Sequence, residues 1–367
     1  METIKAYLDA PNLGTLEKEY ILRAIDSNFV STVGPFVPKF EEEFAKYVGS
    51  KIAVSVQSGT AALHIALYEL GIGPGDEVIV PALTFIATAN AVLYVGATPI
   101  IVDIDPLTWN IDPESIIKAI TSKTKAIIPV HLYGNPCNID AIMKIAEEHN
   151  LYVIEDATES LGATYKGKQT GTFGDFGCFS FNGNKLITTG GGGMIVTNYI
   201  DKAQHIKFLV NQARDASRGY YHPEMGFNYR MTNLEAALGL AQLARIDEFV
   251  EKKREFREIY KKELGDIPYI KFQEEYDKAR GGWWLDCVKF ERDIDINHLI
   301  QQLKEKGVET RRVFMPLGEM PYLKKYSKFA SNAYDIYKNG ICLPSSTLND
   351  EDAIIYTISA LRKALNE

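Results

Sequence analysis

Cys178-Phe-Ser-Phe-Asn-Gly-Asn-Lys185, followed by Leu186-Ile-Thr-Thr-Gly-Gly-Gly-Gly193, combines two predicted strands with a turn that carries one lysine. The run Gly177 to Phe181 predicts a strand, and Met194 to Thr197 predicts the next. A buried lysine is costly while charged, and burial favours the neutral amine that attacks a carbonyl. A lone lysine on a hairpin is more often a solvated surface residue. The hypothesis that Lys185 is reactive therefore depends on the rest of the chain.

Short apolar segments alternate with helical patterns in the first half of the chain. The expected strands are Ile52–Val56, Val78–Val80, Pro99–Val102, Ala126–Val130 and Tyr152–Ile154. The expected helices are Ala61–Leu70, Phe85–Val95, Pro113–Ile120 and Asp140–His149. This alternation predicts an α/β fold with a mostly parallel central sheet covered by helices on both faces. In such sheets the ligand lies beyond the carboxyl ends of the strands.

The composition changes after two further predicted helices, Asn233–Leu243 and Asp247–Leu264. Strand patterns then mix with one helix near Ile296–Lys306, which is typical of a smaller α+β unit. We therefore predict a large α/β domain with an N-terminal arm over residues 1–245 and a small C-terminal α+β domain over 246–367. The charged run that begins at Glu251 is interpreted as the solvated face of its helix.

Composition argues against several classes of partner. The net charge is −8 over 367 residues, which disfavours nucleic acids and anionic membranes as partners. We find neither a targeting leader nor an apolar run long enough to cross a bilayer. The four cysteines are far apart in the sequence, which favours reduced thiols in a cytoplasmic protein and neither disulfides nor a metal site.

Two short motifs resemble parts of a phosphate site. Ser58-Gly59-Thr60 follows a strand and opens a helix, where free N–H groups and a hydroxyl can bind a phosphate. On their own, the same residues are more often a plain helix cap. Ser180, five residues before Lys185, can add another hydroxyl.

Two other residues could contact an aromatic cofactor ring. Asp156 ends a predicted strand and could pair with a protonated ring nitrogen or a metal, or cap the next segment. Phe85 could lie flat on a ring, although a core position is the commoner case. The chain therefore presents, in order, an anion-binding helix start, an aromatic ring, an acid, a serine and a lysine. Pyridoxal 5'-phosphate (PLP) is bound by groups of these kinds: donors for its phosphate, an aromatic face for its ring, a carboxylate for its ring nitrogen and an amine for its aldehyde.

With these residues in view, the chain resembles the DegT/DnrJ/EryC1/StrS family of nucleotide-sugar aminotransferases, which are fold-type-I PLP enzymes. The resemblance runs from about residue 10 to the end. The blocks that carry it are Ser58–Leu63, Pro81–Asn90, Pro129–Gly134, Glu155–Ala157, Phe179–Gly193 and Gly226–Arg230.

The resemblance implies a role for each matching residue. Lys185 would bond the cofactor and later move the substrate proton, and Asp156 would keep the ring nitrogen protonated. Phosphate would be bound by Gly59, Thr60 and Ser180, and Phe85 would stack on the ring. Asn228 would reach the phosphate of a neighbouring subunit, so the implied active unit is a homodimer with shared sites.

Two positions depart from the family pattern. Where Glu159 stands, the family usually has a glutamine or histidine near the ring hydroxyl. A glutamate there would repel a phenolate unless one of the two is protonated, or it could turn toward the sugar. The segment Arg311–Pro316 replaces a tyrosine-containing strand that touches substrate in many relatives.

The implied reaction transfers an amino group from glutamate to the C4 ketone of a nucleotide-linked 4-keto-6-deoxysugar. The lysine turn is most similar to the branch acting on the UDP-linked N-acetylhexosamine, on the route to bacillosamine or legionaminic acid. GDP- and dTDP-linked sugars remain alternatives, as do a sugar 3-dehydratase and a non-catalytic PLP-binding regulator. Those dehydratases replace the lysine with histidine, so Lys185 argues against that alternative.

Overall fold

The computed structural model describes residues 4–327 and 330–366 and is built around a seven-stranded sheet. The order across the sheet is β1-β9-β8-β5-β4-β2-β3. The bounds are β1 (Ile52–Val56), β2 (Glu77–Pro81), β3 (Thr98–Val102), β4 (Thr124–Ile127), β5 (Tyr152–Asp156), β8 (Phe176–Ser180) and β9 (Gly193–Thr197). The predicted α/β fold with a mostly parallel central sheet is confirmed, and each predicted strand is present within a few residues of its expected limits.

One strand runs against all the others. β9 pairs antiparallel with both β1 and β8, whereas the pairs from β8 to β3 are parallel. The alternation of strands and helices does not indicate that β9 separates β1 from β8. This order places Gly193 opposite Val56 on one side and Ser180 on the other. The ends of three strands therefore meet at the lysine turn.

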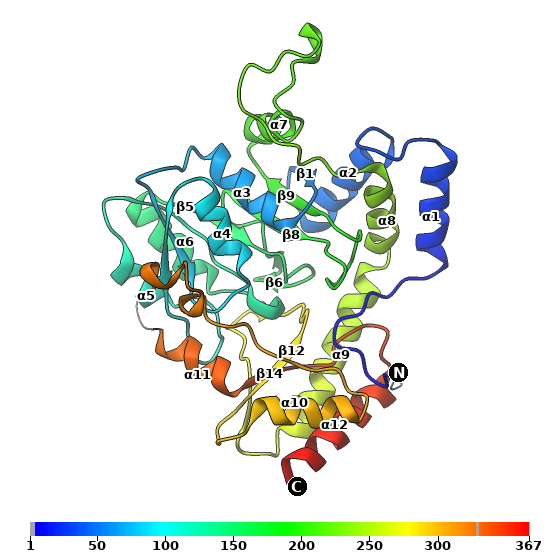
Figure 1. Ribbon diagram of the computed structural model, residues 1–367, viewed down its shortest axis with the longest axis vertical. Coiled ribbons are helices and arrows are strands. Elements are labelled where there is room, and N and C mark those ends of the chain that lie inside the picture. Colours follow the sequence, from blue (N-terminus) through cyan, green and yellow to red (C-terminus); the bar gives the residue numbers. More distant parts are fainter. Residues whose placement is uncertain (1–3, 328–329, 367) are drawn as a thin grey trace.

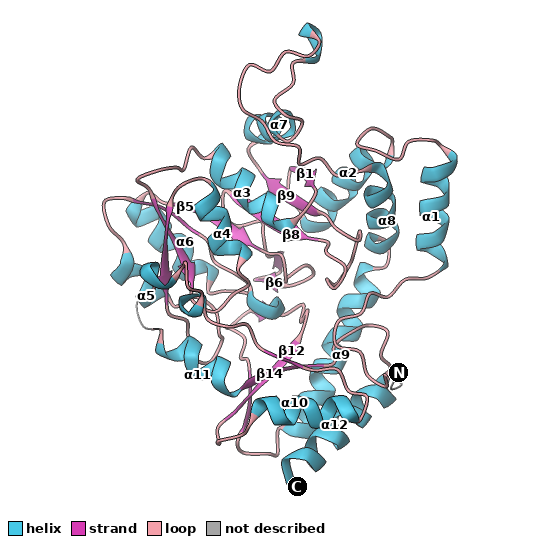
Figure 2. Cartoon of the chain, viewed as in Figure 1, coloured by secondary structure: helices cyan, strands magenta, loops and turns pink. Residues whose placement is uncertain are grey.

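Helices cover both faces of this sheet (Figures 1 and 2). They are α2 (Phe36–Val48), α3 (Gly59–Glu69), α4 (Ala87–Tyr94), α5 (Pro113–Ala119), α6 (Ile139–His149), α7 (Ile200–Leu209) and α8 (Asn233–Leu243), and α1 (Thr15–Asp26) packs against α8. Apolar side chains of α3, α4 and α7 share one core with the sheet, and those of α2 and α8 share another. Alternate residues of β9 enter the two cores, because successive strand side chains point to opposite faces.

A second, antiparallel sheet follows in the order β10-β12-β14-β13. Its strands are β10 (Ile270–Phe272), β12 (Asp286–Phe290), β13 (Arg311–Arg312) and β14 (Gly340–Leu343). The helices of this part of the chain are α9 (Ile246–Leu264), α10 (Ile296–Glu305), α11 (Ser331–Asn339) and α12 (Glu351–Asn366). A small three-stranded sheet joins β6 (Thr164–Tyr165) to β7 (Lys168–Gln169) and β11 (Ala279–Arg280). The predicted boundary at residues 245 and 246 falls between α8 and α9. The predicted domains also include residues 1–3, 328–329 and 367, which lie outside the described part.

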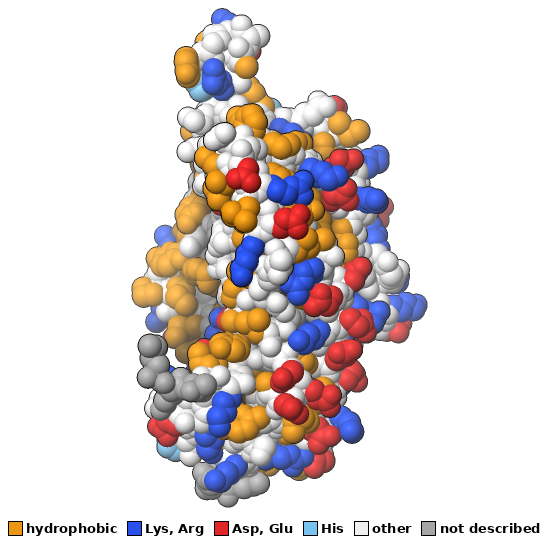
Figure 3. Space-filling model, turned by 90° about the vertical axis from the view of Figure 1, so that its right-hand side faces the viewer, with side chains coloured by type: hydrophobic (Ala, Val, Ile, Leu, Met, Phe, Trp, Pro, Cys, Tyr) orange, Lys and Arg blue, Asp and Glu red, His pale blue; other side chains and the backbone are white. Residues whose placement is uncertain are grey.

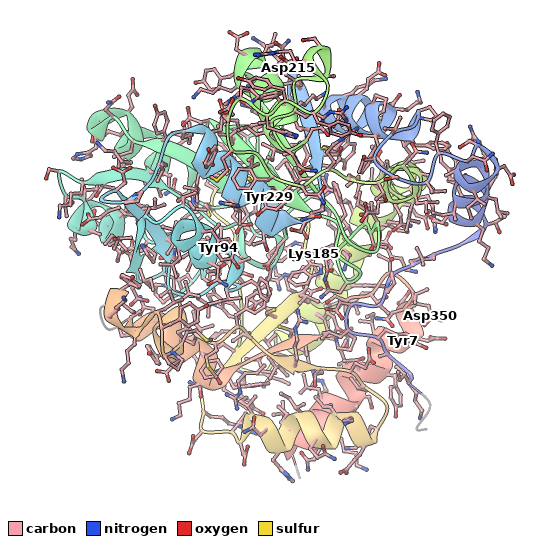
Figure 4. All side chains as sticks on the ribbon, turned by 45° about the horizontal axis from the view of Figure 1, so that its top comes forward. Tyr7, Tyr94, Lys185, Asp215, Tyr229 and Asp350 are labelled. Carbon is pink, nitrogen blue, oxygen red and sulfur yellow. The ribbon has the colours of Figure 1, made fainter. Side chains whose placement is uncertain are left out.

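The described part of the N-terminal arm packs against the second sheet, and Asp9 also contacts Asn184 of the lysine turn. Ala6 pairs with Val308, and the backbone N–H of Leu8 donates to the carboxylate of Glu309 at 3.0 Å. The N–H of Ser345 donates to the carbonyl of Leu8 at 2.8 Å. Figure 4 shows the labelled Tyr7 beside Asp350, which precedes α12. The arm is therefore tied to the second sheet and to the segment that precedes α12.

The solvated-face interpretation of α9 is wrong for two of its charged residues. Lys253 and Arg257 are buried, and the Lys253 amine donates to the carbonyls of Trp284 and Ser345 at 2.9 and 2.6 Å. Burial lowers the pKa of Lys253 to about 8, although Asp286 opposes the shift. The charge pattern of this helix does not indicate that Lys253 and Arg257 pack against other parts of the chain.

A segment between α7 and α8, residues 211–229, extends away from the body at the top of Figure 1. Backbone pairing of Asn211 with Asn228 closes its base, and Asp215, labelled at the top of Figure 4, pairs with Tyr221 further out.

Figure 3 shows acidic and basic side chains interspersed over the face that is on the right in Figure 1. All four cysteines are free and buried. Within the described ranges, no helix combines the length and the apolarity needed to span a membrane.

Glu155, at the end of β5, is a buried anchor. Its carboxylate accepts hydrogen bonds from the backbone N–H groups of Gly171, Phe173 and Gly174 at 2.6–2.8 Å. His131 Nδ1 accepts the N–H of Cys137, so its proton is on Nε2, which donates to Glu155 at 3.0 Å. Burial alone would raise the pKa of Glu155, but the hydrogen bonds from His131 and the backbone outweigh it and lower the pKa.

We expect Glu155→Gln to lower the free energy of unfolding by about 3 kcal/mol, because an amide N–H₂ would face N–H donors in a buried site. A depressed folded-state pKa stabilises the protein above the unfolded value of 4.5 and loses that effect as pH falls through the folded value. Urea unfolding should therefore show a gap between variant and wild type that narrows below pH 4.5. Glu148→Gln, on the exposed face of α6, is the control. A gap that does not change with pH would contradict this account.

Candidate active site

A cavity of about 380 Å³ lies at the carboxyl ends of the central strands, between the two large sheets. Its walls include seven of the eight predicted site residues: Gly59, Thr60, Phe85, Asp156, Glu159, Ser180 and Lys185. Further lining residues are Gln57, Ser58, Thr88, Thr158, Asn182, Asn184, Trp284, Arg311 and Phe314. Figure 4 labels Lys185 where the large part of the molecule meets the part below it.

The lysine turn is held by aromatic packing at its base. Phe181 is fully buried, and its ring lies 5.3 Å from that of Phe40 and 5.4 Å from that of Phe44. Thr188 donates its hydroxyl to the carbonyl of Phe181 at 3.2 Å and closes the turn on the other side. Burial of a large aromatic side chain contributes several kcal/mol to the stability of the fold, so the packing of Phe181 fixes the backbone that precedes Lys185.

The start of α3 provides the predicted cradle. Ser58 caps the helix by accepting the N–H of Ala61 at 3.0 Å, while the first N–H groups of an α-helix have no partner within the helix. Gly59 lets Ser180 approach closely, because a Cβ on Gly59 would lie 2.9 Å from the Ser180 Cβ. Hydroxyls and helix N–H groups therefore face one end of the cavity, where they suit an anion.

Asp156 is 2% exposed and both of its oxygens are held. One accepts the hydroxyl of Thr88 at 2.7 Å, and the other accepts the N–H and the hydroxyl of Thr158 at 3.2 and 2.7 Å. These neutral donors orient the carboxylate without neutralising it. A cationic ring nitrogen in the cavity would complete its environment.

Lys185 and Glu159 face each other across the cavity wall. The Lys185 amine lies 3.8 Å from a Glu159 oxygen and 3.7 Å from the centre of the Trp284 ring, and its side chain is 13% exposed. Burial lowers the pKa of Lys185, although Glu159 and Asp156 oppose the shift. Burial raises the pKa of Glu159, opposed by the Lys185 charge and by the Tyr133 N–H, which donates at 2.8 Å. Burial thus moves both groups toward their neutral forms.

Among the cavity residues that were not identified as site residues from the sequence are Thr88, Trp284 and Phe314. Thr88 lies inside the quoted block Pro81–Asn90, so its position was available as a signal. Trp284 and Phe314 come from the second sheet region, and their rings stack on each other at 6.4 Å. Phe85 is 54% exposed, and the centre of its ring lies 5.8 Å from the centre of the Phe314 ring.

Asn228 is the predicted site residue that the structure places elsewhere. It lies at the base of the extended segment, is exposed, and does not line the cavity. Its role toward a neighbouring subunit stays a prediction. In the described part of the chain, no cluster of three or more His, Cys, Asp or Glu side chains is arranged to hold a metal ion.

Comparison with known proteins identifies relatives over nearly the whole chain. The family model described as "DegT/DnrJ/EryC1/StrS aminotransferase family" matches residues 11–362. GDP-perosamine synthase of Caulobacter vibrioides is 44% identical, with 97% of each chain covered, and that of Escherichia coli O157:H7 is 44% identical over 96% of each. A proposed sugar aminotransferase of Streptococcus pneumoniae, solved in its PLP form, superimposes with a TM-score of 0.93 at 27% identity over 98% of each chain.

We expect Glu159→Gln to lower the pKa of the Lys185 amine further in the cofactor-free protein, because Glu159 is the main group that opposes the lowering. A charge about 4 Å away acts strongly at low effective dielectric, so the shift should be at least about one pH unit. Labelling of Lys185 with acetic anhydride across pH, followed by mass spectrometry of its peptide, measures it. Exposed Lys144 in the same samples is the internal control. An unchanged midpoint would mean that Glu159 carries no charge when Lys185 titrates.

Proposed function

Because the chain belongs to the DegT/DnrJ/EryC1/StrS aminotransferase family, we propose that it transfers an amino group from glutamate to the C4 ketone of a GDP-linked 4-keto-6-deoxysugar. Both reported relatives of 44% identity are named for a GDP-linked product. Their names support the GDP alternative over the UDP-linked sugar that the lysine turn predicted. They give no support to the bacillosamine or legionaminic acid route.

PLP is the cofactor of this family, and the donor set of the cavity fits it. The α3 N-terminus with Thr60 and Ser180 would bind the phosphate, and Asp156 would stand opposite the ring nitrogen. When bound, PLP supplies an electron sink and a carrier for the amino group. Phe85 would cover one face of the ring, as the resemblance implies.

The observation that carries the proposal is the environment of the Lys185 amine. It projects into a cavity whose other walls hold an anion cradle and an oriented carboxylate. Burial favours its neutral form, which can bond a carbonyl carbon and accept a proton. In the proposed reaction, Nζ of Lys185 would take a proton from the α-carbon of the amino donor in one half-reaction and would deliver a proton to C4 of the sugar in the other.

A second copy of the chain would complete the site. Asn228 lies outside the cavity of its own chain, at the base of a segment that extends into solvent. The homodimer with shared sites therefore belongs to the proposal. The side-chain amide of Asn228 would donate a hydrogen bond to the cofactor phosphate bound in the neighbouring subunit.

We expect the PLP-loaded protein to aminate a GDP-linked 4-keto-6-deoxysugar with glutamate, and to aminate UDP- and dTDP-linked 4-keto-6-deoxysugars at least about tenfold more slowly. A tenfold preference corresponds to about 1.4 kcal/mol of differential binding. Products are measured by mass after a fixed time. Preferential amination of a UDP-linked N-acetyl sugar would refute the GDP assignment, and a deoxygenated product would replace transamination by dehydration.

We expect Lys185→Ala to reduce amination below about one-thousandth of the wild-type rate, because proton transfer by a positioned group contributes up to about 10⁴-fold. The fold should persist, since the Phe181 packing is untouched. The measurement combines product formation with thermal melting and non-covalent PLP binding. Lys144→Ala, on an exposed helix face, is the matched control. Turnover in the Lys185 variant would remove this lysine from the mechanism.

A further inference from the structure

Charged side chains in the cavity wall set its preference for anions. Among the described residues that line it, the charged ones are Asp156, Glu159, Lys185 and Arg311. In the proposed function Lys185 is occupied by the cofactor, and the two carboxylates repel anions. Arg311 is then the cation of this lining that is left for an anionic substrate.

Arg311 is held in place from the N-terminal arm. Its Nη1 donates to Asp9 at 3.2 Å, and the same Asp9 oxygen accepts the side-chain N–H of Asn184, the neighbour of Lys185, at 2.9 Å. Asp9 follows Leu8, whose backbone N–H donates to Glu309 and whose carbonyl accepts the N–H of Ser345. The arm therefore sets the position of the guanidinium relative to the lysine turn.

The guanidinium keeps unused donor capacity. A guanidinium has five N–H donors, and Nη2 of Arg311 is enclosed without a hydrogen-bond partner in the described part of the chain. The side chain is 35% exposed, and Arg311 is one of the residues that line the cavity. Unmet donors on a guanidinium that lines a cavity favour a planar acceptor, and a carboxylate accepts from an arginine fork through both oxygens.

Trp284 places this cation close to the reacting amine. The Lys185 amine lies 3.7 Å from the indole ring and the Arg311 guanidinium 5.3 Å from it. The indole N–H donates to the carbonyl of Asn184 at 2.7 Å, which holds the ring that both cations approach.

The chemistry of the two substrates distinguishes which anion Arg311 fits. Glutamate carries its α-carboxylate on the same carbon as the amino group it gives up. A nucleotide sugar reacts at C4, and its diphosphate is attached across the ring at C1. The anion nearest to the reacting atoms is therefore the α-carboxylate of the donor.

We propose that Arg311 anchors the α-carboxylate of the amino donor, and that Asp9 is the positioning residue that aims it. This inference rests on the proposed function, because it assigns the donor half of that reaction to one side of the cavity. The neighbouring Arg312 has other partners, the backbone carbonyls of Tyr337 and Lys338 and the side chain of Asn297. Arg312 is absent from the cavity lining and serves as the matched control.

The test separates the two half-reactions in single turnovers followed by cofactor absorbance. In Arg311→Gln, the glutamate concentration for half-maximal rate should rise about 10- to 100-fold, since a charged hydrogen-bonded contact contributes about 1.5–3 kcal/mol. The half-reaction with the nucleotide sugar should change less than about threefold. Calorimetric binding of 2-oxoglutarate to the PLP form, which involves no turnover, should weaken by the same factor as the glutamate half-reaction.

Arg311→Lys keeps the charge and loses the fork, so it should fall between Gln and wild type. Asp9→Asn should raise the half-saturating glutamate concentration by a smaller factor with little effect on the maximal rate, and it tests the inference if the Gln variant does not fold. Arg312→Gln should leave both half-reactions unchanged. Equal losses in both half-reactions, or a loss confined to the nucleotide sugar, would overturn the inference. Failure of the wild type to react with glutamate would instead refute the proposed function.

Discussion

The cavity depends on one close backbone contact, between Gly193 at the start of β9 and Ser58, the residue that caps α3 after β1 ends. A Cβ on Gly193 would lie 2.5 Å from the carbonyl carbon of Ser58 and 2.8 Å from the nitrogen of Gly59, distances that real side chains do not reach. Gly193 also pairs with Ser180 on its other side. Because no side chain separates these strands, the N-terminus of α3 lies beside the lysine turn. The glycine run thus brings the anion cradle and the amine into one site.

Much of this site could be predicted from sequence because its residues stand at strand ends and in short local patterns. Lys185, Asp156, Ser180 and the residues at the start of α3 each belong to a segment whose strand or helix is recognisable by itself. Parallel topology then gathers such ends at one edge of the sheet. For these residues, local pattern and global arrangement agree.

The remaining features depend on contacts between segments that are far apart in the chain. Trp284 carries no motif, and it enters the cavity because the second sheet packs against the first. Asp9 meets Arg311 across 302 positions of sequence. Lys253 looks like part of a solvated helix, and only tertiary packing explains why two carbonyls enclose its amine. The reversed direction of β9 has the same origin, since a hairpin fixes its pairing with β8 but not its pairing with β1. The lysine turn predicted a UDP-linked sugar, whereas both relatives of 44% identity are named for a GDP-linked product; the turn carries the amine, and its sequence says little about the base of the nucleotide.

The pairing of the first residues with the last part of the chain has a consequence for recombination between relatives. A crossover that exchanges only the segment from α9 onward would join a foreign Glu309 and Ser345 to a resident arm, and the contacts of Ala6, Leu8 and Asp9 would be mismatched. Functional hybrids therefore require two breakpoints, so that both termini come from the same parent. Any substrate preference carried by the second sheet would then be inherited together with the arm that precedes α1, described over residues 4–14.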